Sequence, residues 1–475
     1  MSRTRSPHRA ARRRLRLLVT APALAGALAI GAPPASATST PAQIAASKAI
    51  GVTYLKSLQA ADGSYAGSGL SNEWAFSAFA AAGTAAVDVT PGGDATKNAR
   101  TVYRSLLATP GWPSASPRVT DYERGVLNAY AAGIDPARVS ESRNLIADVY
   151  GFWQSAEPGY FGPSATYNGT VFAGLALGGA RTRSGAQRVP QALLDSVVTR
   201  IRANQHDDGG WDYQKAEGDP ARLAAPSDID MTGASMAALC ASGVPNTDPD
   251  VVQARTFLKN KLDAASGAFN AMFGQNTNSN GWAVSGLHAC GINPQTGDFL
   301  TTKTPVDFLI AQQFKPGGGF RYLPADTAPS AYASIDALRA VAGGGFTAAP
   351  PIPTTAGAPR WVGADSFTAG TATEVALSVD DGAGGLKVCS VSFAPTGATT
   401  TLGDVLAAAG AAALPAGCVT GVTPSSGSGP ITSLNGKANS GSSTWKVSVD
   451  GAAYAGAARE KVVNVGDTIA LRWGV

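Results

Sequence analysis

The sequence predicts a mainly helical protein in which six helical hairpins form a ring, followed by a small α+β domain. Three observations predict it. Alanine-rich apolar stretches recur roughly every 45 to 65 residues, and glycine-rich turns ending in an aromatic residue separate them. Near the end of the chain the apolar residues instead alternate with polar ones, as half-buried strands require. Each apolar stretch is closed by a glycine, at Gly83, Gly133, Gly178, Gly243, Gly291 and Gly343.

The repeated unit is an apolar stretch, a glycine-rich turn and a second apolar stretch. Examples of the turn are QAADGSY from Gln59, QHDDGGW from Gln205 and QFKPGGGF from Gln313. This order is typical of a helix, a turn and a helix. Such pairs bury their apolar faces only by stacking on neighbours, and six pairs are enough to close a ring of twelve helices. We therefore expect residues 42–343 to form an α6/α6 toroid.

The first 37 residues have the pattern of an export signal. Seven arginines and no acidic residue precede a Leu/Ala run, and Ala35, Ser36 and Ala37 form a cleavage site of small residues. The paired arginines allow either general secretion or the twin-arginine route. Cleavage after Ala37 lowers the formal net charge by seven, from +4 to −3. We therefore expect a secreted protein with no nucleic-acid partner and, because no later stretch is long and apolar enough, no transmembrane anchor.

Four cysteines remain in the chain, and export to an oxidising compartment favours disulfides over metal or nucleophile roles. Four cysteines allow three pairings. Cys240 and Cys290 each lie just before a closing glycine, hence at the same end of neighbouring helices, whereas Cys389 and Cys418 lie near the end of the chain. Pairing within each region, Cys240 with Cys290 and Cys389 with Cys418, is the expected arrangement.

Residues 344–360 contain several prolines and no periodic apolar pattern, which predicts a linker. Residues 361–475 follow as a separate small domain. The segments EVALSVDD, KVCSVSFA, WKVSVDG and TIALRWGV alternate as strands do, and TLGDVLAAAG predicts one short helix with Thr401 as its N-cap.

A candidate rim appears when the repeats are aligned on their closing glycines. The residue eleven positions earlier, near the start of each second helix, is Asn72, Tyr122, Tyr167, Thr232, Asn280 or Tyr332. If the second helices form the inner ring, these side chains and Trp282 line one mouth of the central cavity. Helix capping alone would explain the asparagines and the threonine, but not three tyrosines. Aromatic walls with a few convergent polar groups are typical of a small-molecule site.

The motif QHDDGGW with DIDMTGASMAAL resembles the repeats of the squalene-hopene cyclase and protein prenyltransferase superfamily. Class II terpene cyclases of this superfamily carry a DxDD motif whose middle aspartate protonates the substrate. Asp228 and Asp230 match it, but Met231 stands in place of the last aspartate. The resemblance would make Asp230 catalytic only in a cyclase-like protein. The alternative is that both aspartates are helix-start carboxylates that the helix dipole stabilises.

Other chemistries have less support in the sequence. Prenyltransferases hold zinc with Asp, Cys and His, whereas His206 and His288 are the only histidines after the export signal and do not have ligand-like spacing. We therefore expect no metal site. A polysaccharide-active toroid would need two carboxylates across a sugar bond, which Glu73, Glu123 and Asp230 could supply. An enzyme is the less favoured reading.

The tail segments TLGDVLAAAG, ITSLNGKANSGSSTWKVSVDG and VGDTIALRW resemble, in that order, the C-terminal β-domain of transcobalamin and intrinsic factor. In that family the β-domain follows an α6/α6 toroid, and cobalamin lies between the two. The resemblance implies ligand contacts at Asp230 and Thr232 in the toroid and at Asn435 and Trp445 in the tail, although Trp445 could equally be a core residue.

The combined prediction is a secreted protein that binds a small molecule between the toroid mouth and the β-domain. The resemblance makes a corrinoid such as cobalamin the leading ligand. The alternatives are a terpene-cyclase-like or polysaccharide-active enzyme and a non-catalytic cell-envelope interaction module.

Overall fold

The computed structural model describes residues 38–65, 72–163, 166–180, 188–425 and 428–475. The expected export signal, residues 1–37, lies outside the described residues. Within the described ranges, none of the helices combines the length and the apolar character needed to cross a membrane.

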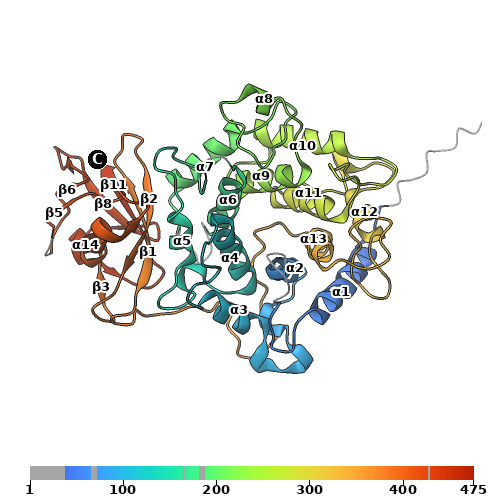
Figure 1. Ribbon diagram of the computed structural model, residues 1–475, viewed down its shortest axis with the longest axis horizontal. Coiled ribbons are helices and arrows are strands. Elements are labelled where there is room, and N and C mark those ends of the chain that lie inside the picture. The colour runs from blue at the N-terminus through green and yellow to red at the C-terminus, as the bar shows by residue number, and fades with distance from the viewer. Residues whose placement is uncertain (1–37, 66–71, 164–165, 181–187, 426–427) are drawn as a thin grey trace, which may run out of the picture. The chain divides into compact units, whose positions relative to one another are not determined.

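Helices surround the centre of the N-terminal part in two layers (Figure 1). In the inner layer each helix contacts the next, and the last contacts the first, so the ring closes. The described inner helices are α2 (Ala75–Ala81), α4 (Val119–Ala132), α6 (Asn168–Ala180), α9 (Ile229–Ala241), α11 (Thr277–Ala289) and α13 (Ala331–Val341).

The outer helices pack against the backs of the inner ones. Helix α1 contacts α13, α3 and α5 contact α4, α7 contacts α6, α10 contacts α9, and α12 contacts both α11 and α13. Their bounds are α1 (Pro41–Ser57), α3 (Ala99–Leu107), α5 (Leu145–Tyr150), α7 (Gln191–Ala203), α10 (Pro249–Lys261) and α12 (Pro305–Ala311), and the short α8 (Pro220–Leu223) lies in the loop before α9. The predicted toroid of helical hairpins is therefore the fold of this part.

The composition of the two layers explains their positions. Inner helices such as α6 and α9 are rich in alanine and glycine and are buried around almost their whole circumference. Outer helices such as α7 bury one apolar stripe, formed by Leu193, Leu194, Val197, Val198 and Ile201, and expose the other face. An amphipathic stripe is what a helix needs at the surface of a core, whereas small side chains let central helices approach closely.

Five of the six closing glycines end a helix as predicted. Gly83, Gly133, Gly243, Gly291 and Gly343 all have φ between 69° and 100°, a conformation that glycine adopts without a Cβ penalty. The prediction for Gly178 is wrong, because α6 continues through it to Ala180. A Cβ at Gly178 would lie 2.8 Å from the carbonyl carbon of Ala241 at the end of α9. This glycine therefore permits close helix packing and does not end its helix.

The C-terminal part is a small α+β domain built on a six-stranded sheet in the order β4-β2-β1-β11-β8-β9. Strand β1 pairs in parallel with β11 and antiparallel with β2, and β8 pairs antiparallel with β11 and β9. Helix α14 (Leu402–Ala412) packs on β2, and Thr401 caps it by accepting the Asp404 N–H, as predicted. The strands of this sheet are β1 (Thr373–Asp380), β2 (Lys387–Phe393), β4 (Ala413–Leu414), β8 (Thr444–Val449), β9 (Ala452–Tyr454) and β11 (Thr468–Gly474).

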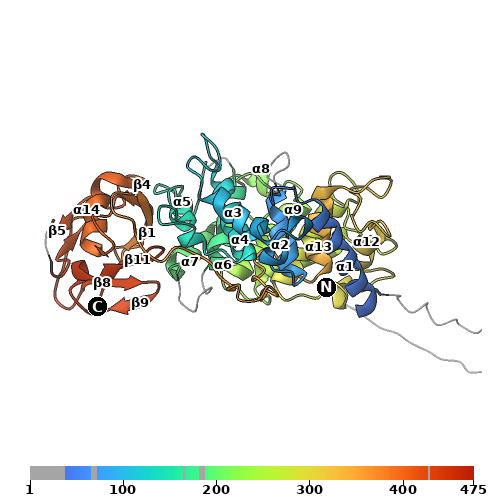
Figure 2. The ribbon, with the colours of Figure 1, turned by 90° about the horizontal axis from the view of Figure 1, so that it is seen from below.

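Shorter strands complete this domain. Strand β3 (Thr400–Thr401) pairs with β10 (Val462–Val463), and β6 (Ser433–Leu434) pairs with both β5 (Val422–Thr423) and β7 (Lys437–Ala438). The domain's sheet contacts α5 through β1 and β2, next to which α5 lies in both ribbon views (Figures 1 and 2). The Thr373 hydroxyl donates a hydrogen bond of 2.8 Å to the carbonyl of Glu141 in the loop before α5.

The segment 344–360 packs against the toroid over much of its length. The side chain of Phe346 is fully buried, and the backbone N–H groups of Thr354 and Thr355 donate to the Asp88 carboxylate. The Pro359 carbonyl accepts a hydrogen bond from Arg100. The sequence indicated only a linker here, because one buried aromatic residue leaves no periodic pattern.

Both predicted disulfides are confirmed. Cys240 pairs with Cys290 at a Cα separation of 5.3 Å, which ties together the ends of α9 and α11. Cys389 of β2 pairs with Cys418 at a Cα separation of 6.1 Å. Each bridge lies within one part of the fold, as expected for cysteines at equivalent helix ends and within one small domain.

Candidate functional site

The first turns of several inner helices line a cavity of about 540 Å³, here called the mouth cavity. Because these residues come from the N-terminal ends of α4, α6, α11 and α13, those ends face the same opening. The lining residues include Trp74, Arg118, Arg124, Phe172, Trp282 and Tyr332. Aligned helix N-termini place partial positive charge and backbone N–H groups at this opening.

Three aromatic side chains form the apolar part of the mouth cavity. Trp282 lies with its ring centroid 5.8 Å from Phe172 and 6.4 Å from Trp74, and both pairs meet edge to face. Phe346, from the segment after the toroid, packs on the same group at 5.0 Å from Trp282 and 6.3 Å from Trp74. Phe346 is fully buried and does not line the cavity, so it supports the aromatic wall from behind.

A fully buried arginine packs against the same aromatic group. The Arg339 guanidinium lies 4.5 Å from the Phe346 ring centroid and 5.7 Å from that of Trp74. It donates to Asp336 at 2.7 Å and to Ser285 at 3.0 Å, so its charge is paired and hydrogen-bonded inside the ring. Burial raises the pKa of Asp336, and Arg339 and Asn278 oppose that rise. A buried charge persists only with such partners.

The two aspartates of the DxD sequence have different roles. Asp228 is the N-cap of α9 and accepts the Met231 N–H at 2.8 Å, as the helix-start reading of the motif predicts. Asp230 follows in the first turn, and its Oδ1 is buried with no hydrogen-bond partner among the described residues. Burial, helped by the nearby charge of Asp228, raises the pKa of Asp230 to about 7. Asp230 can therefore hold or release a proton near neutral pH.

Two of the predicted rim residues hold the turns of the fold. The Thr232 hydroxyl accepts the Trp211 N–H at 3.1 Å, and Asn280 Oδ1 accepts the Phe269 N–H at 2.7 Å. The same bond recurs between Thr170 and the Phe161 N–H and between Ser334 and the Phe320 N–H. Helices α6, α9, α11 and α13 thus each fix the aromatic residue that ends a glycine-rich turn. Alignment on those aromatic residues, rather than on the closing glycines, would have identified the repeated position.

The predicted tyrosines lie in three different environments. Tyr332 is 42% exposed and lines the mouth cavity, together with Trp282. Tyr167 is fully buried, and its hydroxyl lies 3.2 Å from that of Ser235. Tyr122 packs edge to face on Trp112. Asn72 begins the 3₁₀ turn Asn72–Trp74, and its side chain lies outside the described part of the chain.

The two tail residues expected at the ligand are held inside the β-domain. Asn435 has φ of 52° in a tight turn, and its amide bonds to the Thr420 N–H and the Cys418 carbonyl. Trp445 is 6% exposed and donates its indole N–H to the Lys437 carbonyl at 2.8 Å. Neither residue lines the mouth cavity, so the structure does not bring them to Trp282 and Tyr332.

Several residues in or behind the wall of the mouth cavity were missed by the sequence reasoning. Arg124, Phe172 and Asp336 lie further along their helices than the position used for alignment, and Phe346 lies beyond the toroid. Within the described ranges, no group of three or more His, Cys, Asp or Glu side chains is arranged to hold a metal ion.

Comparison with known proteins found no matching family model and no matching curated protein. Among solved structures, the type II terpene cyclase MstE from Scytonema aligns with 13% identity and a TM-score of 0.38, over 64% of this chain and 98% of its own. Candida albicans protein geranylgeranyltransferase-I, complexed with GGPP, aligns with 13% identity and a TM-score of 0.38, over 64% and 85%. Haptocorrin in complex with Cbi aligns with 11% identity and a TM-score of 0.29, over 90% and 96%. Because these three TM-scores lie below 0.5, the functional proposal rests on the side chains of this chain.

Proposed function

We propose that this protein binds a small organic molecule in the mouth cavity. The observation that carries the proposal is the combination of an aromatic wall, formed by Trp74, Phe172 and Trp282, with polar side chains at the edge such as Arg118 and Tyr332. Its volume of about 540 Å³ is within the usual range of ligand pockets.

The aromatic group favours a ligand with a flat or apolar ring. Edge-to-face packing fixes the orientation of Trp282 between Trp74 and Phe172, so a ligand meets a preformed surface and loses little affinity to side-chain ordering. The polar groups and helix N-termini at the edge favour hydrogen-bond acceptors on the periphery of that ligand. A corrinoid, a flat macrocycle with amide groups around its edge, fits this description and is the first ligand to test.

Equilibrium dialysis of residues 38–475 with cobalamin and with cobinamide tests the proposal. Tyr332→Ala removes an exposed wall residue and should weaken binding about tenfold. Tyr213→Ala, at a tyrosine 52% exposed and outside the cavity lining, is the matched control and should leave binding within about twofold. Trp445→Phe keeps an aromatic ring in the core of the β-domain. Weaker corrinoid binding by this variant would indicate that the β-domain contributes to the site.

The identity of the ligand and the location of its site are tested by separate outcomes. If neither corrinoid binds, mass spectrometry of small molecules that copurify with the native protein identifies the ligand to use instead. If that ligand binds equally well to Tyr332→Ala and to Trp282→Leu, the mouth cavity is not its site.

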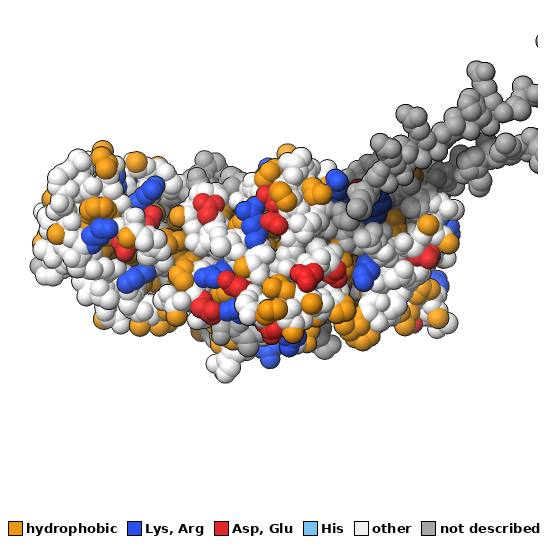
Figure 3. Space-filling model, turned by 90° about the horizontal axis from the view of Figure 1, so that it is seen from above, with side chains coloured by type: hydrophobic (Ala, Val, Ile, Leu, Met, Phe, Trp, Pro, Cys, Tyr) orange, Lys and Arg blue, Asp and Glu red, His pale blue; other side chains and the backbone are white. Residues whose placement is uncertain are grey.

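A second candidate function is a cell-envelope interaction module in which the toroid is only a scaffold. The packing of Phe346 and Arg339 against Trp74 and Trp282 favours it, because these side chains take up space inside the ring that a ligand would otherwise use. On the face shown in Figure 3, acidic and basic side chains are interspersed, as on an ordinary solvated surface. A native protein that copurifies with a wall polymer and without any small molecule would favour this candidate.

Export is part of the proposal. The arginine-rich and apolar residues 1–37 and the two disulfides support a secreted protein. Determination of the N-terminus of the protein recovered from culture medium tests it, and a protein found only in the cytoplasm with its first residues intact would contradict it.

A further inference from the structure

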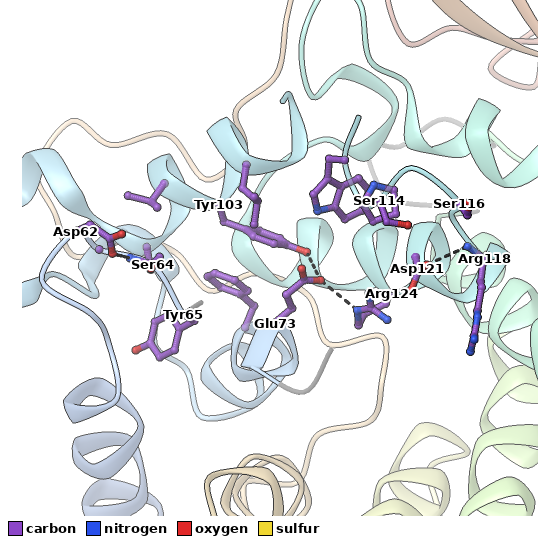
Figure 4. Close-up of a pocket in the computed structure, with 17 residues that line it drawn as sticks. Asp62, Ser64, Tyr65, Glu73, Tyr103, Ser114, Ser116, Arg118, Asp121 and Arg124 are labelled. Carbon is purple, nitrogen blue, oxygen red and sulfur yellow. Dashed lines mark hydrogen bonds and ion pairs between the residues drawn. The ribbon is translucent and has the colours of Figure 1, made fainter. Parts of the chain in front are cut away.

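A second and larger cavity, of about 820 Å³, lies between α3, the 3₁₀ turn Asn72–Trp74 and the start of α4, and is here called the lateral cavity (Figure 4). Aromatic and apolar side chains form most of its walls, among them Tyr65, Phe76, Tyr103 and Trp112. Phe76 and Tyr103 stack at 4.4 Å, and Tyr65 meets Phe76 edge to face at 6.0 Å. These contacts make the walls a rigid aromatic box.

One carboxylate is held at the inner end of this box. Glu73 Oε2 accepts hydrogen bonds from the Tyr103 hydroxyl at 3.3 Å and from Arg124 Nε at 3.2 Å. Its side chain is only 18% exposed, and Oε1 takes no hydrogen bond from a described residue. In Figure 4 the carboxylate lies between Tyr103 and Arg124. Glu73 therefore presents an acceptor to the cavity in a fixed orientation.

The charge at this end of the cavity is negative. Arg124 is shared by Glu73 and by Asp121, which lies 3.2 Å from its other side, so one guanidinium faces two carboxylates. Arg118 is exposed, and Figure 4 shows its side chain extending away from Glu73. Asp62, at the other side of the lining in Figure 4, is a further acidic group of the cavity. A negative end within aromatic walls attracts a cation both by charge and through the ring faces.

We propose that the lateral cavity binds a hydrophobic amine, with its ammonium group on Glu73 and its apolar body between the aromatic walls. The ammonium donates to Glu73 Oε1, the oxygen that takes no hydrogen bond from a described residue. A neutral analogue keeps the apolar contacts and loses the ion pair, and an anionic analogue meets two carboxylates. This site is independent of the ligand in the mouth cavity.

The test uses three probes that share a naphthalene ring: naphthalen-2-ylmethylamine, naphthalen-2-ylmethanol and naphthalene-2-carboxylate. Isothermal titration of the full mature chain at pH 7 should give an affinity for the amine about tenfold or more above that for the alcohol, as expected for a hydrogen bond to a partly buried charge. The carboxylate should bind no better than the alcohol. Equal affinities, or no binding of the amine, would overturn the proposal.

Two variants and a control locate the site. Glu73→Gln keeps an acceptor for Tyr103 and Arg124 but removes the charge, so it should lower amine affinity about tenfold and leave alcohol affinity within twofold. Glu157→Gln removes a carboxylate paired with Lys215 elsewhere and should change neither. Leu106→Trp, at a lining residue 41% exposed, fills the cavity and should weaken all three probes. If Leu106→Trp leaves amine binding unchanged, the amine binds elsewhere and the proposal fails, even where Glu73→Gln does not fold.

Discussion

Two inner helices carry the same short motif, an aspartate followed three residues later by an arginine, in different surroundings. On α13, Asp336 and Arg339 are 2.7 Å apart with side chains 4% and 0% exposed, and the arginine lies against Phe346 at the centre of the ring. On α4, Asp121 and Arg124 are 3.2 Å apart, and Arg124 lines both the mouth cavity and the lateral cavity.

The difference between the two pairs shows that the surroundings of the Asp and Arg side chains, and not the spacing alone, decide what the motif does. Asp336 lines the mouth cavity, but the α13 side chains are only 4% and 0% exposed, so their charges regain little water if one partner is lost. The α4 pair adjoins two cavities and shares its arginine with Glu73, so its charges can be rehydrated or engaged by a ligand. The first pair contributes only Asp336 to the mouth cavity, whereas the second lines the lateral cavity with both side chains and the mouth cavity with Arg124.

The largest expected effect is from Arg339→Met. This change leaves Asp336 buried without its cation and should lower the free energy of unfolding by about 4 kcal/mol. Urea denaturation measures it. The double variant with Asp336→Asn, which removes the uncompensated charge, should recover a substantial part of that loss. A loss below about 1 kcal/mol for the single variant would mean that the ring centre is hydrated.

Phe346→Ala tests whether the segment after the toroid is packed into the ring. Its fully buried ring contacts Trp282, and removal of a buried aromatic side chain should cost about 3 kcal/mol. Ile352→Ala, in the same segment but at a side chain 77% exposed, is the matched control and should change stability by about 0.5 kcal/mol or less. Equal effects in thermal denaturation would show that the segment is a detached linker.

The fold could be predicted because its main signals are local. Five closing glycines need a positive φ, which the sequence expresses as Gly after an alanine-rich stretch. Alternation in the tail likewise predicts strands, of which β8 alternates in burial while the central β1 is buried on both faces, and helix-end placement predicted Cys240–Cys290. Gly178 was misread because a glycine required by a neighbouring helix has the same sequence appearance as one that ends a helix.

The site was less predictable because its walls depend on packing between repeats. Tyr332 was found at the aligned position and Trp282 two residues after it in its own repeat, but Thr232 and Asn280, also at the aligned position, serve the turns instead. The central role of Phe346 depends on a contact between segments far apart in sequence. Nothing local distinguishes it from other residues of a proline-rich segment.

Asp230 can be compared with Asp336 and Asp121. Its Oδ1 is also buried, but no described arginine forms an ion pair with it. Its pKa of about 7 in the folded protein exceeds the ordinary value of an aspartate, so the folded state binds its proton more tightly than the unfolded state. The stabilisation is complete below about pH 4 and is lost as the pH rises towards 7. Asp230→Asn should remove this dependence, raising stability at pH 8 relative to the wild type by on the order of 2 kcal/mol. Parallel stability curves for the two proteins between pH 4 and pH 8 would contradict it.

The smallest effect is expected from Arg124→Met, the counterpart of Arg339→Met at a pair whose side chains are 7% and 12% exposed and adjoin two cavities. Glu73 keeps its hydrogen bond from Tyr103, and both carboxylates left behind can gain water from the adjoining cavities. The unfolding free energy should therefore fall by only about 1 kcal/mol, which urea denaturation beside the Arg339→Met variant measures directly. Without Arg124 the charge of Glu73 and Asp121 is unopposed, so the lateral cavity should bind naphthalen-2-ylmethylamine more tightly. A stability loss as large as that of Arg339→Met would show that the two motifs are buried alike, and an unchanged amine affinity would separate Arg124 from the lateral cavity.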